Sequence, residues 1–98
     1  MLKNFRTYNL AAELYRLCIE LKLEKHMMEQ LKRASLSVVL NLAEGSAKPT
    51  VKDRAKFYAI AFSSLRETQA ILELGNTEAE LKAKADNVAA HLYRLCRA

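Results

Sequence analysis

Residues that interrupt helices are scarce in this 98-residue chain and occur at only three places. Its two glycines are Gly45 and Gly75, and its single proline is Pro49. Proline cannot continue a helix, and a glycine in the left-handed conformation commonly closes one, so we expect long helices that stop at these positions. No stretch shows the strict alternation of apolar and polar residues that is typical of a half-buried strand. The sequence therefore predicts an all-α fold, with one domain over residues 1–98.

Apolar residues at helical spacing predict four helices, at about 4–23, 25–44, 51–74 and 77–97. Thr50, three residues before Asp53, is a suitable N-cap for the third helix, and Thr77 with Glu80 has the spacing of a capping box for the fourth. The segment 22–26 between the first two helices contains neither Gly nor Pro, so one continuous helix is the alternative there. Four helices of similar length with short connections favour an antiparallel up-and-down bundle.

The predicted first helix carries two apolar stripes. The first contains Phe5, Tyr8, Ala12, Tyr15 and Ile19, and the second contains Leu10, Leu14, Leu17 and Leu21. If one stripe faces the core of the bundle, the other needs a surface outside the protomer. A chain of this size also buries only about 60–70% of its unfolded surface by itself. We therefore expect the protein to form a homo-oligomer.

An unusual polar strip runs along the predicted second helix. At about 100° per residue, Arg33, Ser37, Asn41 and Glu44 fall on one line. Two of them, Ser37 and Asn41, are short hydrogen-bonding groups. Ser64 and Glu67 offer complementary groups on the predicted third helix. Because an unpaired buried polar atom costs roughly 1–3 kcal/mol, we expect a structural polar network in which Arg33 pairs with Glu67. Its predicted members are Arg33, Ser37, Asn41, Glu44, Ser64 and Glu67.

The charge balance favours an anionic partner. Sixteen Lys and Arg against 11 Asp and Glu give a net charge of +5, which suits nucleic acid but also occurs in proteins without such a partner. The candidate phosphate-binding residues lie in the second loop and on the third helix: Lys48, Lys52, Lys56 and Arg66. A second positive surface is expected on the fourth helix from Lys82, Lys84, Arg94 and Arg97. We expect no aromatic residue among these cations to stack on bases, so the contacts should be with backbone phosphates.

Residues for catalysis are missing. The chain has no Gly-rich phosphate loop and no Cys or His cluster, and Leu23 and Val88 stand where an inward Glu-x-x-His pair would need Glu before His26 and His91. We therefore expect no enzyme activity, no cofactor and no bound metal. No apolar run approaches the roughly 20 residues of a membrane span, and no signal peptide is recognisable, so we expect a cytoplasmic protein.

The segment Gln30–Ser37, followed by Asn41-Leu42-Ala43-Glu44-Gly45 and by Ser64-Leu65-Arg66-Glu67, resembles the bacterial four-helix-bundle proteins encoded in intervening sequences of large-subunit ribosomal RNA genes. This resemblance implies an up-and-down bundle that assembles as a homopentamer. It also implies similarity to the accessory variability determinant of diversity-generating retroelements, a basic barrel that binds nucleic acid and its reverse transcriptase. The chain departs from the family pattern at Lys32, where Arg is usual, and at Ser63, where Gly is usual.

These features together predict a non-enzymatic, homo-oligomeric, basic helical bundle that binds RNA or DNA through backbone phosphates. The alternative is an oligomeric scaffold that binds another protein and uses its positive charge for solubility. The sequence does not distinguish RNA from DNA. A binding titration over a salt series separates the two functions, because phosphate contacts weaken steeply with salt.

Overall fold

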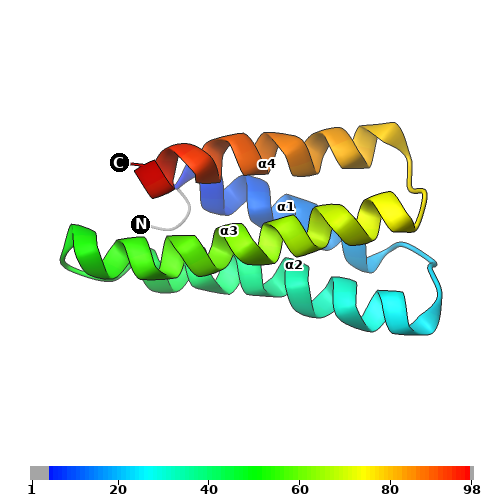
Figure 1. The fold of residues 1–98 in the computed structure, drawn as a ribbon, viewed down its shortest axis with the longest axis horizontal. Helices are drawn as coiled ribbons and strands as arrows, with labels where there is room; N and C mark the ends of the chain where they lie inside the picture. The colour runs from blue at the N-terminus through cyan, green and yellow to red at the C-terminus, as the bar shows by residue number, and fades with distance from the viewer. Residues whose placement is uncertain (1–4, 98) are drawn as a thin grey trace.

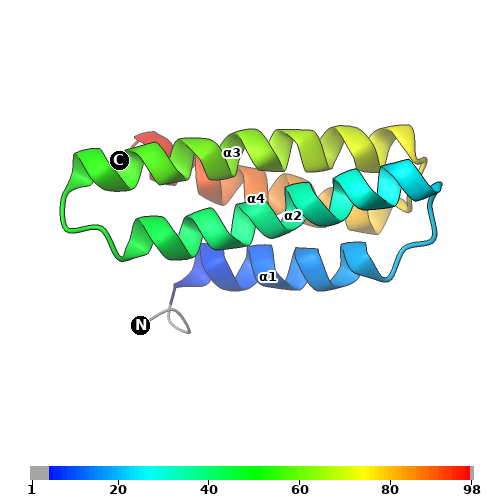
Figure 2. The ribbon, with the colours of Figure 1, turned by 90° about the horizontal axis from the view of Figure 1, so that it is seen from below.

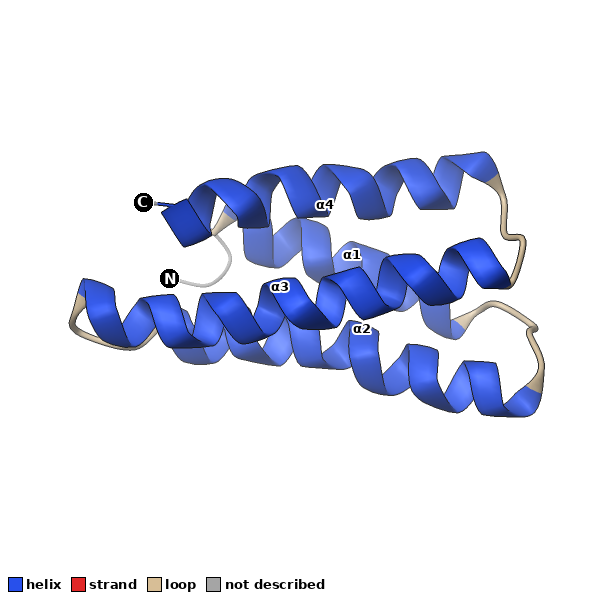
Figure 3. Ribbon diagram, in the orientation of Figure 1, coloured by secondary structure: helices blue, strands red, loops and turns tan. Residues whose placement is uncertain are grey.

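The computed structural model describes residues 5–97, which form four α-helices and no strand. Helix α1 spans Arg6–Ile19, α2 spans Lys25–Ser46, α3 spans Val51–Leu74 and α4 spans Ala79–Arg97. The helices run alternately up and down, so the start of α1 and the end of α4 lie at the same end of the molecule as the α2–α3 loop (Figures 1 and 3). The predicted all-α four-helix bundle is confirmed.

The first two helices are separate, so the continuous-helix alternative is wrong. Helix α1 ends at Ile19, four residues before the predicted Leu23. After it, Leu21 and Leu23 alternate with the exposed Lys22 and pack against the core, because an extended segment turns every second side chain to the same side. Helix α2 then begins after Glu24, whose carboxylate accepts a hydrogen bond from the backbone N–H of His26 as its N-cap, so the two helices are separated without a glycine or proline. The predicted start of the first helix at Asn4 lies outside the described residues.

Helix α2 continues two residues beyond its predicted end and passes through Gly45. Gly45 does not have a positive φ, so its predicted left-handed conformation is wrong. Its role is steric, because a Cβ added at Gly45 would lie 2.7 Å from Cε1 of Tyr58 and 3.1 Å from Cβ of Phe57. The missing side chain thus allows α2 and α3 to approach each other closely next to their connecting loop.

Of the two predicted N-caps, the one at the start of α3 is confirmed and the one at the start of α4 is wrong. The hydroxyl of Thr50 accepts a hydrogen bond from the backbone N–H of Asp53 at 3.1 Å, as predicted for the N-cap of α3. Helix α4 begins two residues later than predicted. The hydroxyl of Thr77 donates to the carbonyl oxygen of Leu72 at 2.9 Å, so Thr77 closes α3 instead of capping α4.

One apolar core runs between the four helices. Among the four pairs of neighbouring helices, contacts are most extensive between α2 and α3 and least extensive between α1 and α4, and Figure 2 shows α2 running between α1 and α3. The largest side chains that are almost fully buried come from all four helices and include Leu14, Leu31, Leu42, Leu65, Leu72 and Leu92. The core therefore depends chiefly on leucine, with its tightest packing on the α2–α3 side.

Most of the apolar surface that the two predicted stripes place on α1 is covered within the protomer. Helix α1 turns Ala11, Leu14 and Cys18 into the core, and among its described residues Leu17, at 38% exposure, is the one large apolar side chain that is exposed. The prediction of a whole uncovered stripe is wrong because α2 and α4 cover α1 from its two sides. The exposed apolar residues near the middle of α2 and α3 are Leu36, Leu40 and Ile60, at 37%, 57% and 48% exposure.

Candidate nucleic-acid interface

Hydrogen bonds engage five of the six residues predicted to form a polar network, four of them between α2 and α3 and Asn41 within α2. The guanidinium group of Arg33 donates to the carboxylate of Glu67. The hydroxyl oxygens of Ser37 and Ser64 are 2.7 Å apart, and the amide of Asn41 donates to the backbone carbonyl and the hydroxyl of Ser37 at 2.9 and 3.1 Å. Such specific pairs fix how α2 and α3 are aligned along their length.

The Arg33–Glu67 pair lies at the outer edge of the α2–α3 contact, whereas Ser64 is buried. The side chains of Arg33 and Glu67 are 56% and 41% exposed, and an ion pair exposed to that extent contributes about 0–1 kcal/mol. Glu44, the sixth predicted member, does not join the network and instead lies 3.4 Å from the ammonium group of Lys48. The network therefore sets alignment more than it adds stability.

The four predicted phosphate-binding residues do not form a single cluster. Lys48 lies in the α2–α3 loop, with its ammonium group 5.0 Å from the centroid of the Phe57 ring. Lys52 is exposed in the first turn of α3, and the exposed Lys56 is 4.0 Å from the carboxylate of Asp53. Arg66 is 14 residues beyond Lys52, about 21 Å farther along the helix axis. Three of the four thus lie at one end of the bundle, and Arg66 lies past the midpoint of α3.

Other helices contribute cations to the same end. If each helix is divided at its middle, the half of the molecule that contains the α2–α3 loop carries seven Lys and Arg residues against Glu44 and Asp53. The opposite half of the described chain carries eight Lys and Arg against nine Asp and Glu. The positive charge of the protein is thus concentrated in one half. We call this surface the basic end; its cations are Arg6, Lys48, Lys52, Arg54, Lys56, Arg94 and Arg97.

The second positive surface predicted on α4 is divided between the two halves. Arg94 and Arg97 belong to the basic end, whereas Lys82 and Lys84 lie near the start of α4. Their ammonium groups pair with acidic residues of neighbouring helices, Lys82 with Glu73 at 3.5 Å and Lys84 with Glu13 at 3.1 Å. The sequence prediction did not include Arg6 and Arg54, although the alternating helix directions indicate that the start of α1 lies beside the α2–α3 loop.

His91 is the titratable imidazole of the basic end. The guanidinium group of Arg94 lies 3.3 Å from Nδ1 of His91, and since Arg can only donate, Nδ1 must accept this bond. Partial burial, together with the charges of Arg94 and Arg6, lowers the pKa of His91 below its usual value. These interactions therefore favour the neutral ring over the protonated one in the free protein.

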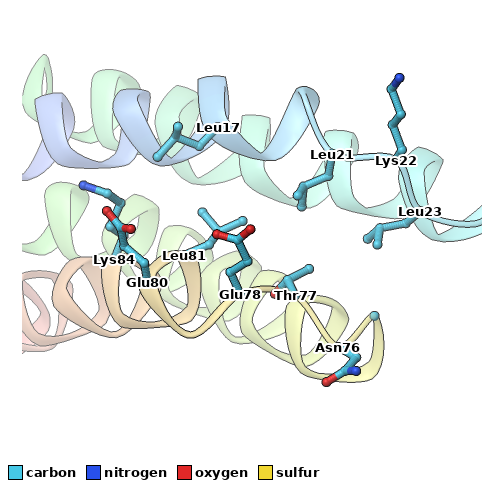
Figure 4. Close-up of a pocket in the computed structure, with 11 residues that line it drawn as sticks. Leu17, Leu21, Lys22, Leu23, Asn76, Thr77, Glu78, Glu80, Leu81 and Lys84 are labelled. Carbon is cyan, nitrogen blue, oxygen red and sulfur yellow. The ribbon is translucent and has the colours of Figure 1, made fainter.

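A groove of about 430 Å³ opens where α1 ends and α4 begins (Figure 4). Figure 4 shows Leu17, Leu21 and Leu23 on one side and Leu81 on the other. Glu78, Glu80 and Lys84 also line it, and Lys84 is already paired with Glu13. Lys22 is the second cation of its lining, so the two acidic residues balance the two lysines and the groove carries no excess of positive charge for phosphate.

The described residues offer few groups for other chemistry. Within residues 5–97, no three His, Cys, Asp or Glu side chains gather in a way that could hold a metal ion. Burial raises the pKa of the Cys18 thiol to about 11 and also raises the pKa of Cys96, so neither is a ready nucleophile at neutral pH. None of the described helices has the length and apolar character needed to cross a membrane.

Comparison with known proteins identifies a related family. The model of a family described as 23S rRNA-intervening sequence protein matches residues 5–97, a range that contains all four helices. No curated protein matches the chain significantly.

Proposed function

This chain belongs to the 23S rRNA-intervening sequence protein family, and we propose that it is a non-enzymatic, homo-oligomeric bundle that binds RNA or DNA through backbone phosphates. A homopentamer is the assembly that the family resemblance implies, and we propose it for this chain. Binding of this kind needs no cofactor or metal, because Lys and Arg side chains supply the opposing charge.

The basic end is the observation that carries this proposal. It contains seven Lys and Arg residues and only two acidic residues, while the other half of the described chain is close to neutral. Lysine and arginine that neutralise phosphates release the counterions condensed on the nucleic acid, and this release drives binding without regard to base sequence. Cations concentrated at one end can contact more neighbouring phosphates of one nucleic acid than the same number of cations spread evenly over the molecule.

The α2–α3 face supports the proposed assembly. The Ser37–Ser64 contact aligns the antiparallel helices, so Leu40, one turn after Ser37, and Ile60, one turn before Ser64, come to the same level. With Leu36 they form an exposed apolar strip, which we call the α2–α3 strip. Apolar surface bordered by polar groups is typical of a protein interface. In a ring of copies related by rotation, all basic ends would lie on the same side, so their phosphate contacts would add up.

A titration with charge-matched variants tests the binding proposal. Fluorescently labelled RNA and DNA are titrated with the protein over a salt series of about 50 to 200 mM. The variant Lys52→Glu/Lys56→Glu should bind more weakly than the parent. The slope of log K against log salt should also be shallower, by roughly 0.9 for each phosphate that the variant no longer neutralises. The control Lys22→Glu/Lys25→Glu changes the net charge by the same amount at the opposite end and should bind like the parent. Absence of binding by the parent at the lowest salt would refute the proposal.

The alternative function is an oligomeric scaffold for another protein. The leucine-lined groove between α1 and α4 favours it, since apolar grooves are common docking sites for protein segments. A partner protein that is recovered with the chain after nuclease treatment, together with no binding to nucleic acid at low salt, would replace the first proposal by this one.

A further inference from the structure

Two aromatic rings and two guanidinium groups form a row across α3 and α4. The guanidinium carbon of Arg66 is 4.9 Å from the centroid of the Phe62 ring, and the centroids of Phe62 and Tyr93 are 6.3 Å apart. The guanidinium carbon of Arg97 is 5.2 Å from the centroid of Tyr93, whose side chain is 50% exposed. The expectation that no aromatic residue stands among the cations is wrong, because Phe62 and Tyr93 each lie one helical turn before an arginine. The packing of α4 against α3 then brings the two rings side by side.

A hollow of about 320 Å³ lies beside this row, at the low end of the size of ligand pockets. Along α4, Ala89 and Ala90 separate Asp86 from Tyr93, and these small side chains leave the space open. The residues that line the hollow are Phe62, Arg66, Gln69, Asp86, Ala89, Ala90 and Tyr93. Aromatic rings therefore line one part of it, and polar groups line another.

The polar side of the hollow is held in place by hydrogen bonds. The amide nitrogen of Gln69 donates to the carboxylate of Asp86 at 2.9 Å, and its carbonyl oxygen accepts from Arg66 at 3.0 Å. Gln69 keeps one amide hydrogen and one lone pair for a further partner, and Arg66 keeps several N–H donors. The Asp86 carboxylate repels a phosphate from the hollow itself. This combination suits an uncharged planar group that has hydrogen-bonding edges.

We propose that the hollow holds one unpaired base of a single-stranded RNA or DNA, stacked on Tyr93, with the flanking phosphates at Arg66 and Arg97. The inference depends on the proposed nucleic-acid function and adds to it the strand type that this surface prefers. A paired base inside a duplex cannot present its face to an aromatic side chain, whereas every unpaired base can. Arg97 also belongs to the basic end, so the same strand continues onto that surface.

Replacement of Tyr93 tests the stacking. The probes are a short oligouridine, an abasic strand of equal length and a duplex of equal length. Tyr93→Ala should bind oligouridine at least about fivefold more weakly, with the same salt dependence, and should bind the abasic strand and the duplex like the parent. Tyr93→Phe, which keeps the ring and loses the hydroxyl that Arg97 contacts at 2.8 Å, should retain most of the affinity for oligouridine. Because the chain has no tryptophan, Tyr93→Trp supplies a single fluorophore that oligouridine should quench.

The outcomes separate this inference from the function on which it rests. The stacking would be overturned if Tyr93→Ala lost the same affinity for all three probes, or lost none for any of them. Phosphate binding would stand in both cases. A change in the mass of Tyr93→Ala in light scattering would show that the face is a contact between copies, and would also overturn it. If the parent protein binds none of the probes at low salt, the proposed function itself fails.

Discussion

His91 is the residue of the basic end whose charge changes closest to neutral pH. In the free protein, partial burial and the charges of Arg94 and Arg6 lower the pKa of its imidazole. A phosphate bound at the basic end acts in the opposite direction, because its negative charge favours the protonated ring. Binding should therefore be accompanied by uptake of a proton at His91, and this coupling makes the affinity depend on pH.

The affinity for nucleic acid should rise as the pH falls from about 7.5 to 5.5. The reason is that a bound phosphate raises the pKa of His91, so the protonated protein binds the nucleic acid more tightly than the neutral one. His91→Gln, which cannot be protonated, should lose most of this pH dependence. His26→Gln is the control, because His26 lies at the opposite end of the bundle and faces Glu29. Equal pH dependence in the parent and in His91→Gln would contradict the assignment.

The contact between α2 and α3 next to their loop depends on the absence of a side chain at Gly45. A Cβ there would meet the ring of Tyr58 at 2.7 Å, and that ring is buried and packs 6.3 Å from the ring of Phe5. Helix propensity alone predicts that alanine at this position would stabilise α2 by about 1 kcal/mol. The close contact predicts the opposite sign.

Gly45→Ala should lower the free energy of unfolding by about 1–3 kcal/mol, which is typical of overpacking in a core. The bulkier Gly45→Val should cost more, because it adds further atoms to the same contact. Denaturant unfolding followed by circular dichroism measures both. Higher stability of Gly45→Ala than of the parent would show that Tyr58 moves aside without cost, and that the glycine is not needed for helix packing.

At the level of elements, residue patterns predicted the parts of the fold that depend on local sequence. Apolar periodicity with Gly45, Pro49 and Gly75 located all four helices, and the bounds of α3 are the predicted ones. The misplaced boundaries depend on tertiary contacts. Leu21 and Leu23 follow the helical pattern but leave α1 to pack against the end of the bundle, and Thr77 bonds back to Leu72 across the turn.

The candidate site was predictable only where it lies along one pair of adjacent helices. The Arg33–Glu67 and Ser37–Ser64 contacts follow from the spacing of polar residues on α2 and α3. The basic end joins side chains from the two termini and the central loop, which are distant in the sequence, so a search for local runs of charge did not find it. The row from Arg66 to Arg97 likewise depends on how α3 and α4 pack.

At the scale of the whole molecule, charge and exposed apolar surface lie in different places. The basic end holds the excess of positive charge, while the α2–α3 strip is exposed near the middle of the bundle. A second copy seated on the strip would leave the basic end open. The proposed assembly and the proposed binding are therefore compatible, and a change to the strip should alter the number of copies without removing any cation.

The variant Leu40→Gln/Ile60→Gln should assemble less than the parent. In light scattering, the parent should give several times the 11.1 kDa mass of one chain, and five times for the proposed pentamer. The variant should shift toward the mass of one chain, because polar amides replace the apolar atoms of the proposed interface. Leu74→Gln is the control, since Leu74 is 79% exposed but lies at the far end of α3. A monomeric parent would refute the assembly.

The same variant also shows whether assembly strengthens binding, because its two substitutions leave the net charge unchanged. Each phosphate contact steepens the slope of log K against log salt by roughly 0.9 on duplex DNA, and a ring that presents several basic ends to one duplex makes more such contacts than a single copy. The parent should therefore show a slope several times that of the dissociated variant, and Leu74→Gln should match the parent. Equal slopes for a ring and a single copy would mean that each nucleic acid contacts one basic end alone. Assembly would then not increase the number of phosphate contacts.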